Sequence, residues 1–282
     1  IRSSLKLNNF KGFRKILYEL IWDFLPINYL EDFNSFRKKL YTQTKHFNPR
    51  AIVTSMAGSM EDDLLSFFLA IKGKNAPKVI SLQHGGLYGT AKYNSVEKHE
   101  IKISDFFLSW GWKSNENVVP SFLHKHLRKK INHYNGGKYL VFINYSCPKH
   151  DYRISPSLMS TDMDKYIDSQ SSFFKNIRSE IKEKVKVRLY VDDFNWGTKK
   201  KLDRQLDSFN YSSKSYDQDL KRAKIIVPTY NSTTILESLA LNIPTVALFD
   251  PLAEKYNENS LQYFRKLFDV KIIHYDYKSA AN

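Results

Sequence analysis

A run of small polar residues near the end of the chain has the residue types of an anion-binding site. YNSTT, at 230–234, stands between the apolar run KIIVP and the helical pattern TILESLAL. A strand, a short polar turn and a helix together direct free backbone N–H groups and a helix dipole toward an anion. Ser232, Thr233 and Thr234 add hydroxyl donors, and Asn231 is a favourable type for the helix cap. The pattern predicts a seat for a phosphate or a nucleotide.

Glu237 follows this turn at a spacing that allows two roles. It lies three residues after Thr234, which is the spacing of a capping box. It could equally bind the ribose or base of a nucleotide held by the same turn. Both interpretations stay open from the sequence.

A second polar cluster, SLQHGGLYG at 81–89, follows an apolar run. Gly85 and Gly86 permit close backbone approach. His84 would lie where a strand ends, and parallel sheets bind ligands at that edge. A neutral imidazole accepts a proton, and a charged one pairs with a phosphate or a carboxylate, although a lone histidine is often only structural. We expect Gln83 and Tyr88 to shape the same loop.

Strand and helix patterns alternate along the chain around these clusters. After a helical region over residues 1–48, strands and helices follow one another from AIVTSM at 51–56 to KIIHY at 271–275. The predicted helices include those at 61–73, at 121–134 and at 163–184. Alternation of this kind is typical of βαβ units with parallel sheets. HYNGGK, at 133–138, interrupts both periodicities. The sequence predicts an α/β fold with two Rossmann-like domains, residues 1–135 and 136–282, facing a central cleft.

Composition limits the classes of protein that fit. The chain has 282 residues, with 44 Lys and Arg against 29 Asp and Glu, so the net charge of +15 favours a negatively charged partner. The single Cys147 excludes an internal disulfide framework and favours a reducing compartment. No apolar stretch reaches the roughly 20 residues that a membrane span needs. Helical residues precede the first strand of the first domain, so we expect that domain to be incomplete.

The ordered motifs resemble a known family. YNSTTILESLALNIPTV, which begins at Tyr230, is similar to the donor-binding segment of GT-B type glycosyltransferases. SLQHGGLYG, VEKHEIKISDFFLSWGW, CPKHDYRISP, VRLYVDDFNWG and KSAA recur in this order in a family of bacterial O-antigen and surface-polysaccharide biosynthesis transferases. The set is also similar to retaining β-Kdo glycosyltransferases. One departure is FNWG at 194–197, where the family pattern has an aromatic residue, Gly and Trp, which leaves the local turn open.

This resemblance implies a GT-B-like glycosyltransferase of lipopolysaccharide, O-antigen or capsule assembly. Its first domain would hold acceptor and catalytic groups, and its second would bind the nucleotide sugar. The donor implied is CMP-β-Kdo, used with retention, and the acceptor a lipid-linked glycan. We expect a cytoplasmic protein at the inner face of the inner membrane, where anionic lipids attract basic surfaces. No cofactor or nucleic-acid partner is expected.

The resemblance also directs attention to particular acidic and basic residues. Asp105, within SDFFLSWGW, would be the nucleophile of a retaining enzyme or the base of an inverting one; alternatively it only bonds a neighbouring backbone N–H. Glu61 and Glu100 are second choices for acid–base work. Arg153 and Arg188 suit binding of a donor phosphate or carboxylate, and Arg188 could instead pair with an internal carboxylate such as Asp192.

Other functions remain compatible with the sequence. We expect catalysis without a metal, because no acidic pair stands on an evident metal-binding loop, but Asp192 and Asp193 keep a metal site open. A CDP-polyol phosphotransferase would use a similar architecture. A nucleic-acid or anion-binding α/β module fits the charge but lacks an aromatic and basic stacking platform. A catalytically silent half of a larger polymerase also remains open.

Overall fold

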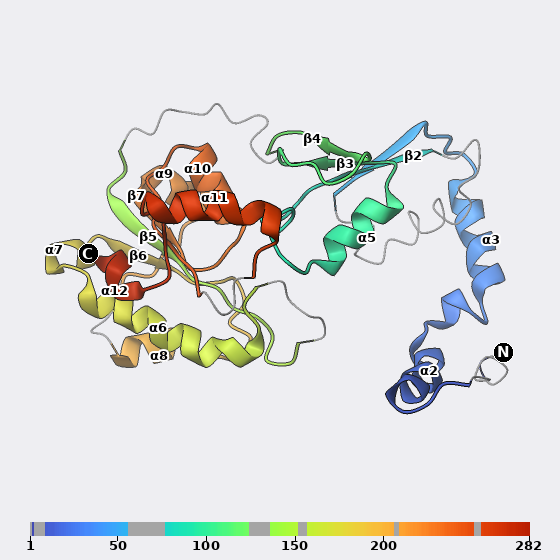
Figure 1. Cartoon of the computed structure of the whole chain (residues 1–282), viewed down its shortest axis with the longest axis horizontal. Helices are drawn as coiled ribbons and strands as arrows, with labels where there is room; N and C mark the ends of the chain where they lie inside the picture. The colour runs from blue at the N-terminus through green and yellow to red at the C-terminus, as the bar shows by residue number, and fades with distance from the viewer. Residues whose placement is uncertain are drawn as a thin grey trace. The chain divides into compact units, whose positions relative to one another are not determined.

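The computed structural model of the protein describes residues 2, 9–55, 77–123, 136–151, 157–205, 209–250 and 255–282 (Figure 1). The chain forms two compact units. The first contains Ile1–Ser81 and Ile103–Asp105, and the second contains Leu82–Lys102 and Phe106–Asn282. The predicted helix at 61–73 and most of the predicted helix at 121–134 lie outside the described residues, as does part of the interruption at 133–138. The domain boundary at 135 therefore stays a prediction.

The first unit consists of helices followed by parallel strands. Its described elements are α2 (Phe13–Phe24), the 3-10 helix η1 (Ile27–Tyr29), α3 (Phe33–Thr44), β1 (Ala51–Thr54) and β2 (Lys78–Leu82). Helix α2 ends two residues before Pro26, as the sequence predicts, because proline cannot continue a helix. Strands β1 and β2 are parallel, with Ile52 opposite Val79.

The second unit begins with the chain that leaves β2. Helix α5 (Ser95–Ile103) leads into β3 (Phe106–Ser109), which pairs in parallel with β4 (Val118–Pro120). Buried side chains from the loop after β2, from α5 and from both strands pack together, and they are Tyr88, Ile101, Phe107 and Val118. This small core fixes the loop that contains the QHGG motif.

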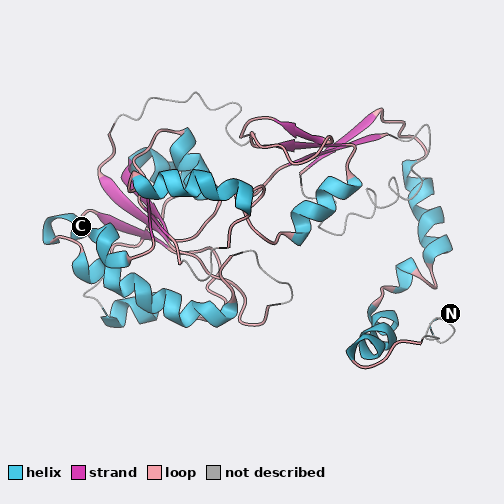
Figure 2. Ribbon diagram, in the orientation of Figure 1, coloured by secondary structure: helices cyan, strands magenta, loops and turns pink. Residues whose placement is uncertain are grey.

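A larger parallel sheet makes up the rest of the second unit, in the order β6 (Val185–Arg188), β5 (Tyr139–Ile143) and β7 (Ala223–Pro228). Beside it, β8 (Ala247–Leu248) pairs in parallel with β9 (Ile273–His274). The helices are α6 (Met163–Asn176), α7 (Ser179–Lys182), α8 (Thr198–Gln205), α9 (Tyr216–Arg222), α10 (Thr233–Ala240), α11 (Glu258–Asp269) and α12 (Tyr277–Ala281), with the 3-10 helix η4 (Ser160–Asp162) before α6. Figure 2 shows helices on both faces of this sheet.

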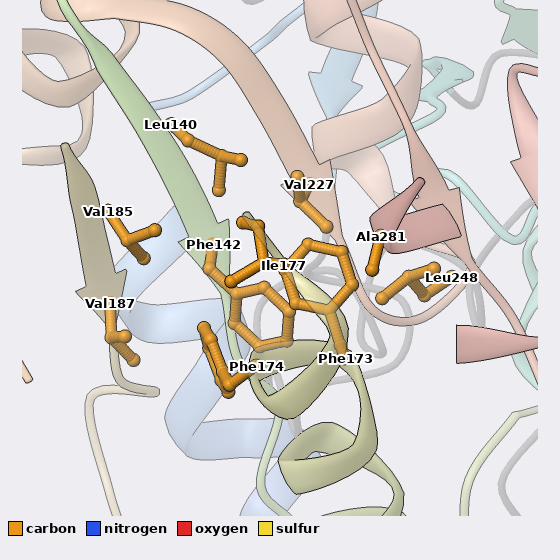
Figure 3. Close-up of a cluster of buried hydrophobic side chains, with 10 residues drawn as sticks. All are labelled: Leu140, Phe142, Phe173, Phe174, Ile177, Val185, Val187, Val227, Leu248 and Ala281. Carbon is orange, nitrogen blue, oxygen red and sulfur yellow. The ribbon is translucent and has the colours of Figure 1, made fainter. Parts of the chain in front are cut away.

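Strand β5 is buried on both faces, which explains its uninterrupted apolar sequence YLVFI. Leu140 and Phe142 face the core that includes Phe173 and Phe174 of α6 (Figure 3). Val141 and Ile143, which alternate with them, face a second core with Leu220 and Ile226. Helices on both faces and parallel strands confirm the predicted α/β class.

The structure corrects the helix predicted after the first strand of this sheet. The pattern MDKYIDSQSSFFKNIRSEIKEK predicts one helix, but α6 ends at Asn176 and the short α7 follows. Ile177 leaves the helical conformation, with a ψ of 140° that is typical of extended chain, and its side chain is buried in the core that also contains Leu140 and Phe142 of β5. Burial of this one side chain overrides the continuous helical pattern.

Candidate functional site

The turn after β7 caps helix α10 with a serine. Ser232 has extended backbone angles, and its hydroxyl oxygen accepts a hydrogen bond from the N–H of Thr234 at 3.2 Å. The cap is therefore Ser232 and not Asn231, which corrects the sequence prediction. Asn231 is 2% exposed, and its side-chain nitrogen lies 3.5 Å from Oγ1 of Thr90. Asn231 thus anchors the turn, while Ser232 begins the helix.

The QHGG loop packs directly on this turn, within the second unit. The N–H of Gly86 donates to Oγ1 of Thr233 at 3.2 Å, across 147 residues of sequence. A Cβ atom on Gly86 would lie 2.4 Å from the carbonyl carbon of Ser232 and 2.5 Å from the nitrogen of Thr233. Only glycine allows this approach. The two motifs that the sequence singles out therefore form one site.

The packing leaves one of the three hydroxyls of the turn partly exposed. Ser232 and Thr234 are each 8% exposed, and the Ser232 oxygen already caps the helix. Thr233 is half-buried at the first turn of α10. A bound anion would therefore meet Thr233 and backbone N–H groups of this turn, together with groups of the QHGG loop.

His84, Tyr88 and Glu100 form a hydrogen-bonded chain beside this junction. The hydroxyl of Tyr88 donates to Oε2 of Glu100 at 2.8 Å and lies 3.2 Å from Nε2 of His84. Nδ1 of His84 lies 3.9 Å from the same carboxylate oxygen. Since the Tyr88 proton goes to Glu100, the Tyr88 oxygen accepts from Nε2–H of His84, which leaves Nδ1 as the basic nitrogen. Glu100 is 1% exposed, whereas the His84 side chain is 25% exposed.

Gln83 fixes the start of the loop. Its Oε1 accepts from the backbone N–H of Trp110 and from Nε1–H of Trp112, each at 2.8 Å. Its Nε2 donates to the carbonyl of Gly85 at 2.8 Å. Gln83 therefore ties the conformation of the two glycines to the WGW segment after β3. Gly85 itself lies against the ring of Tyr88.

A second tie holds the same loop to the start of α11. The side chain of Asn257 donates to the carbonyl of Gly89 at 2.8 Å, and its backbone N–H donates to the carbonyl of Thr90 at 2.9 Å. Ser260 Oγ donates to the Thr90 carbonyl at 3.0 Å. The loop between β2 and α5 is therefore bonded through Gly86 to the start of α10 and through Gly89 and Thr90 to the start of α11.

A sequence-family model for LIC12162 family transferases matches residues 1–282, the whole chain. The chain belongs to the LIC12162 family of transferases. Among curated proteins, no sequence matches it significantly.

Two solved structures resemble this LIC12162 family transferase. One is assigned as a UDP-N-acetylglucosamine 2-epimerase from Listeria monocytogenes, with 11% identity, a TM-score of 0.47 and coverage of 95% of this chain and 83% of that one. The other is an α,α-trehalose-phosphate synthase (UDP-forming) from Burkholderia vietnamiensis, with 10% identity, a TM-score of 0.44 and coverage of 99% and 73%. At such scores neither resemblance identifies an activity.

Asp105 of this transferase binds backbone at the beginning of β2. Its Oδ2 accepts from the N–H of Val79 at 2.8 Å, and its Oδ1 lies 3.3 Å from Nζ of Lys78. His84, by contrast, follows the end of β2. The geometry of Asp105 favours the structural alternative over a nucleophile. Glu61, the other predicted carboxylate of the first domain, lies outside the described residues.

Arg188 pairs with an internal carboxylate, but not the predicted one. Its Nη1 lies 2.9 Å from Oδ2 of Asp219 and donates to the carbonyl of Lys214 at 2.8 Å. The guanidinium also lies over the ring of Tyr216, 5.7 Å from its centre. Arg188 therefore joins β6 to α9. Arg153 lies outside the described residues.

Glu237 is buried in α10, at 1% exposure, beside Tyr216. Because Ser232 is the cap, Glu237 is the fifth residue of the helix, so the capping-box interpretation is wrong. Burial raises the pKa of the Tyr216 hydroxyl well above its usual range, and the neighbouring Glu237 raises it further. Ribose or base recognition by Glu237 remains a prediction.

Tyr230 lies in an aromatic row in the second unit. Its ring centre is 4.6 Å from that of Tyr145, which is in turn 5.7 Å from that of Tyr190. Burial raises the pKa of the Tyr145 hydroxyl above its usual value. The row leads from the turn before α10 to the loop after β6.

The two aspartates of VDDFNWG shape a turn. Oδ1 of Asp192 accepts from the N–H of Phe194 at 2.9 Å, and the Asp193 carboxylate accepts from the N–H groups of Gly197 and Thr198 at 2.7 and 3.0 Å. Within the described part of the chain, no three His, Cys, Asp or Glu side chains gather as a metal site would require.

Among the described residues, no helix is long and apolar enough to cross a membrane.

Glu97 is a site residue that the sequence did not single out. Its Oε2 accepts from the N–H of Gly89 at 2.8 Å, so α5 supports the QHGG loop through Glu97 as well as Glu100. Burial raises the pKa of Glu97, against the opposing effects of the Gly89 N–H and Lys98. The three-residue spacing of the two glutamates places them on one helix face, which is the signal that could have found them.

Proposed function

We propose that this transferase is a glycosyltransferase that moves a sugar from a nucleotide-linked donor to a glycan acceptor. In this proposal the donor phosphate binds at the first turn of α10 and the reacting sugar lies next to the QHGG loop. The proposal rests on the hydrogen bond from the N–H of Gly86 to Oγ1 of Thr233, which joins the proposed anion-binding turn to the loop that contains His84.

The chemistry needs a stabilised phosphate leaving group and a proton acceptor for the acceptor hydroxyl. The first turn of α10 supplies N–H groups and the positive end of a helix dipole for the phosphate. His84 stands two residues before Gly86 and is supported by Tyr88 and Glu100. Nδ1 of His84 lies 3.9 Å from a Glu100 carboxylate oxygen and is buried without a hydrogen-bond partner among the described residues, so the imidazole would have to move slightly for Nδ1 to reach a substrate.

The sequence motifs support a narrower proposal for the substrates. The donor would be CMP-β-Kdo, transferred with retention, and the acceptor a lipid-linked glycan of lipopolysaccharide, O-antigen or capsule. The net charge of +15 supports peripheral binding to an anionic membrane face. Cosedimentation with phosphatidylglycerol vesicles at about 50 and about 500 mM salt would test this membrane binding. Binding that does not weaken with salt would contradict an electrostatic origin.

The activity test uses the whole chain with a panel of CMP-, CDP-, UDP- and GDP-linked sugars, including CMP-Kdo. Nucleotide release is measured with and without extracted lipid-linked glycan, and the product is examined by mass spectrometry. We expect acceptor-dependent release of one nucleotide and a glycan heavier by one sugar. Release of CMP with transfer of a polyol phosphate would instead identify the phosphotransferase alternative. Failure to consume any donor would contradict the proposal.

A further inference from the structure

A cavity of about 500 Å³ opens in the second unit, and its lining includes none of the residues assigned to the donor phosphate or to proton transfer. It lies where β5 and β6 end and α8 begins. The carboxyl edge of a parallel sheet is a preferred place for ligands, and this volume falls in the range of small-molecule sites. Its lining comes from the loop after β5, the loop after β6 and the first turn of α8, and includes Asn144, Ser146, Tyr190, Asp193, Thr198 and Lys200.

Internal hydrogen bonds fix the wall of this cavity. Asn144 donates to Oε1 of Gln170 at 3.0 Å, and both side chains are at most 2% exposed. Ser146 Oγ donates to the carbonyl of Asp193 at 3.1 Å. The Asp193 carboxylate in turn holds the N–H groups that begin α8. A wall built in this way keeps its shape before a ligand arrives, which lowers the entropy cost of binding.

Two buried polar atoms of this region have no hydrogen-bond partner among the described residues. They are Oγ1 of Thr198, in the cavity wall, and Nε2 of Gln170, directly behind Asn144. Thr198 is 2% exposed and Gln170 is fully buried. Buried polar groups are nearly always paired in folded proteins, and unpaired ones need an explanation. After a small movement of the cavity wall, a ligand rich in hydroxyl groups would give the Thr198 hydroxyl a hydrogen-bond partner.

The loop that borders the cavity has a strained backbone. Phe194 and Asn195 are not glycines, yet both have positive φ angles, of 49° and 62°. Strain of this kind persists where the surrounding structure enforces it, and it is frequent at ligand sites. Here it sets the Phe194 ring 6.5 Å from that of Tyr190, which lines the cavity and is 38% exposed. A tyrosine ring held this way offers an apolar face for the C–H side of a sugar ring.

One lysine at the rim can pair with an anionic group of a ligand. The ammonium of Lys199 lies 2.9 Å from Oδ2 of Asp203 and over the ring of Tyr211, so its charge is already balanced. The Asp193 carboxylate is engaged by backbone N–H groups. Lys200 is exposed, and in the part of the chain that the structure describes no carboxylate pairs with it. Lys200 is therefore the rim lysine that is available to pair with an anionic group of a ligand.

We infer that this cavity binds a carbohydrate ring that carries a carboxylate or a phosphate. Tyr190 would contact the ring, the amides of Asn144 and Asn195 would bind its hydroxyls, and Lys200 would pair with the anionic group. The inference does not depend on the proposed function, because the cavity and the Gly86–Thr233 junction share no residue. The ring could belong to the donor or to a separate glycan.

The test measures binding of free rings to the whole chain by isothermal titration calorimetry, with glucuronate, glucose 6-phosphate, glucose and inorganic phosphate as probes. We expect the two anionic rings to bind at least about tenfold more tightly than glucose or phosphate. K200A should weaken the binding of the anionic rings about tenfold, and Y190L should weaken the binding of all rings. The exposed-lysine control K175A should leave every affinity unchanged. T233V should also leave ring binding unchanged, which separates this cavity from the donor seat.

Saturating CMP, CMP-Kdo and UDP-glucuronate then distinguish the two sources of the ring. If a separate glycan supplies it, the free ring still binds in their presence; if the donor supplies it, the matching nucleotide sugar displaces the ring while CMP alone does not. Either result supports the cavity as a carbohydrate site. The absence of saturable binding by any ring, or ring binding that neither K200A nor Y190L weakens, would overturn the inference.

Discussion

At the scale of single residues, Gly86 is the position where the two motifs meet. A Cβ there would lie 2.4–2.5 Å from backbone atoms of Ser232 and Thr233, which cannot rotate away. Overpacking of this kind costs about 1–3 kcal/mol. G86A should therefore lower the free energy of unfolding by that amount, measured by urea denaturation. G85A is the matched control, because its Cβ would meet only the Tyr88 ring at 3.4 Å. Equal stability of the two variants would disprove the close approach.

His84 is the residue whose loss should affect chemistry more than stability. Its side chain is one-quarter exposed, so H84A should keep a melting temperature near that of the parent protein. Loss of a general acid–base group typically costs 10²–10⁴-fold in rate, and we expect about 10²-fold or more in kcat for nucleotide release. H99A, on the exposed side of α5, is the control. Wild-type kcat in H84A would exclude His84 from the reaction.

Glu97 gives a pH dependence with a definite sign. Burial raises its pKa in the folded protein, so the folded state tolerates the carboxylate less well than the unfolded chain does. Stability from this group is complete below the unfolded pKa of about 4.3 and is lost as pH rises through the folded pKa. E97Q keeps an oxygen for the Gly89 N–H and removes the titration. It should be more stable than the parent protein at pH 8, with a difference that vanishes near pH 4; a difference independent of pH would contradict this cause.

At the scale of elements, helix α10 depends on its serine cap. S232A removes the oxygen that accepts from the Thr234 N–H, so stability should fall by about 1 kcal/mol, whereas S232G should cost only a few tenths. S172A, in the exposed face of α6, is the control and should be neutral or slightly stabilising. Chemical denaturation measures all three. A neutral S232A would show that the helix begins elsewhere.

The elements that the sequence predicts are those with strong apolar patterns. Strands β5 and β7 contribute to cores on both faces and contain evident apolar runs, whereas in β6, VKVR, apolar and charged residues alternate. Helix α8, with the sequence TKKKLDRQ, has no such signal, because Leu202 is its one buried apolar residue among side chains that the structure describes. Strand β4 is only three residues long and ends in proline. Short or highly charged elements owe their form to tertiary contacts, which a local pattern does not contain.

The two motifs of the site could be predicted from the sequence, but the contact between them could not. Both the QHGG and YNSTT motifs carry residue types that indicate anion and proton chemistry, and the structure describes both. Their contact joins positions 147 residues apart, so no local spacing could predict it. Asn231 and Ser232 are equally good cap types, and only the backbone angles show that Ser232 begins the helix. The bonds of Asp105 to the start of β2 depend likewise on the pairing of distant segments.

At the scale of the whole molecule, the residues proposed for phosphate binding and proton transfer lie in one compact unit. The QHGG loop, α5, the turn before α10 and the start of α11 all belong to Leu82–Lys102 and Phe106–Asn282. The family identification as a transferase covers both units. Ligands that bind this junction should therefore stabilise the second unit directly.

Thermal stabilisation by CMP, CDP, UDP and GDP can be measured for the parent protein, T233V, H84A and the exposed-threonine control T161V. A nucleotide at 100 times its Kd adds about 2.7 kcal/mol, which raises the melting temperature by several degrees. We predict selective stabilisation by CMP that T233V loses and that H84A and T161V retain. Stabilisation by no nucleotide, or equal stabilisation of T233V, would contradict the assignment of the α10 turn as the donor-phosphate seat.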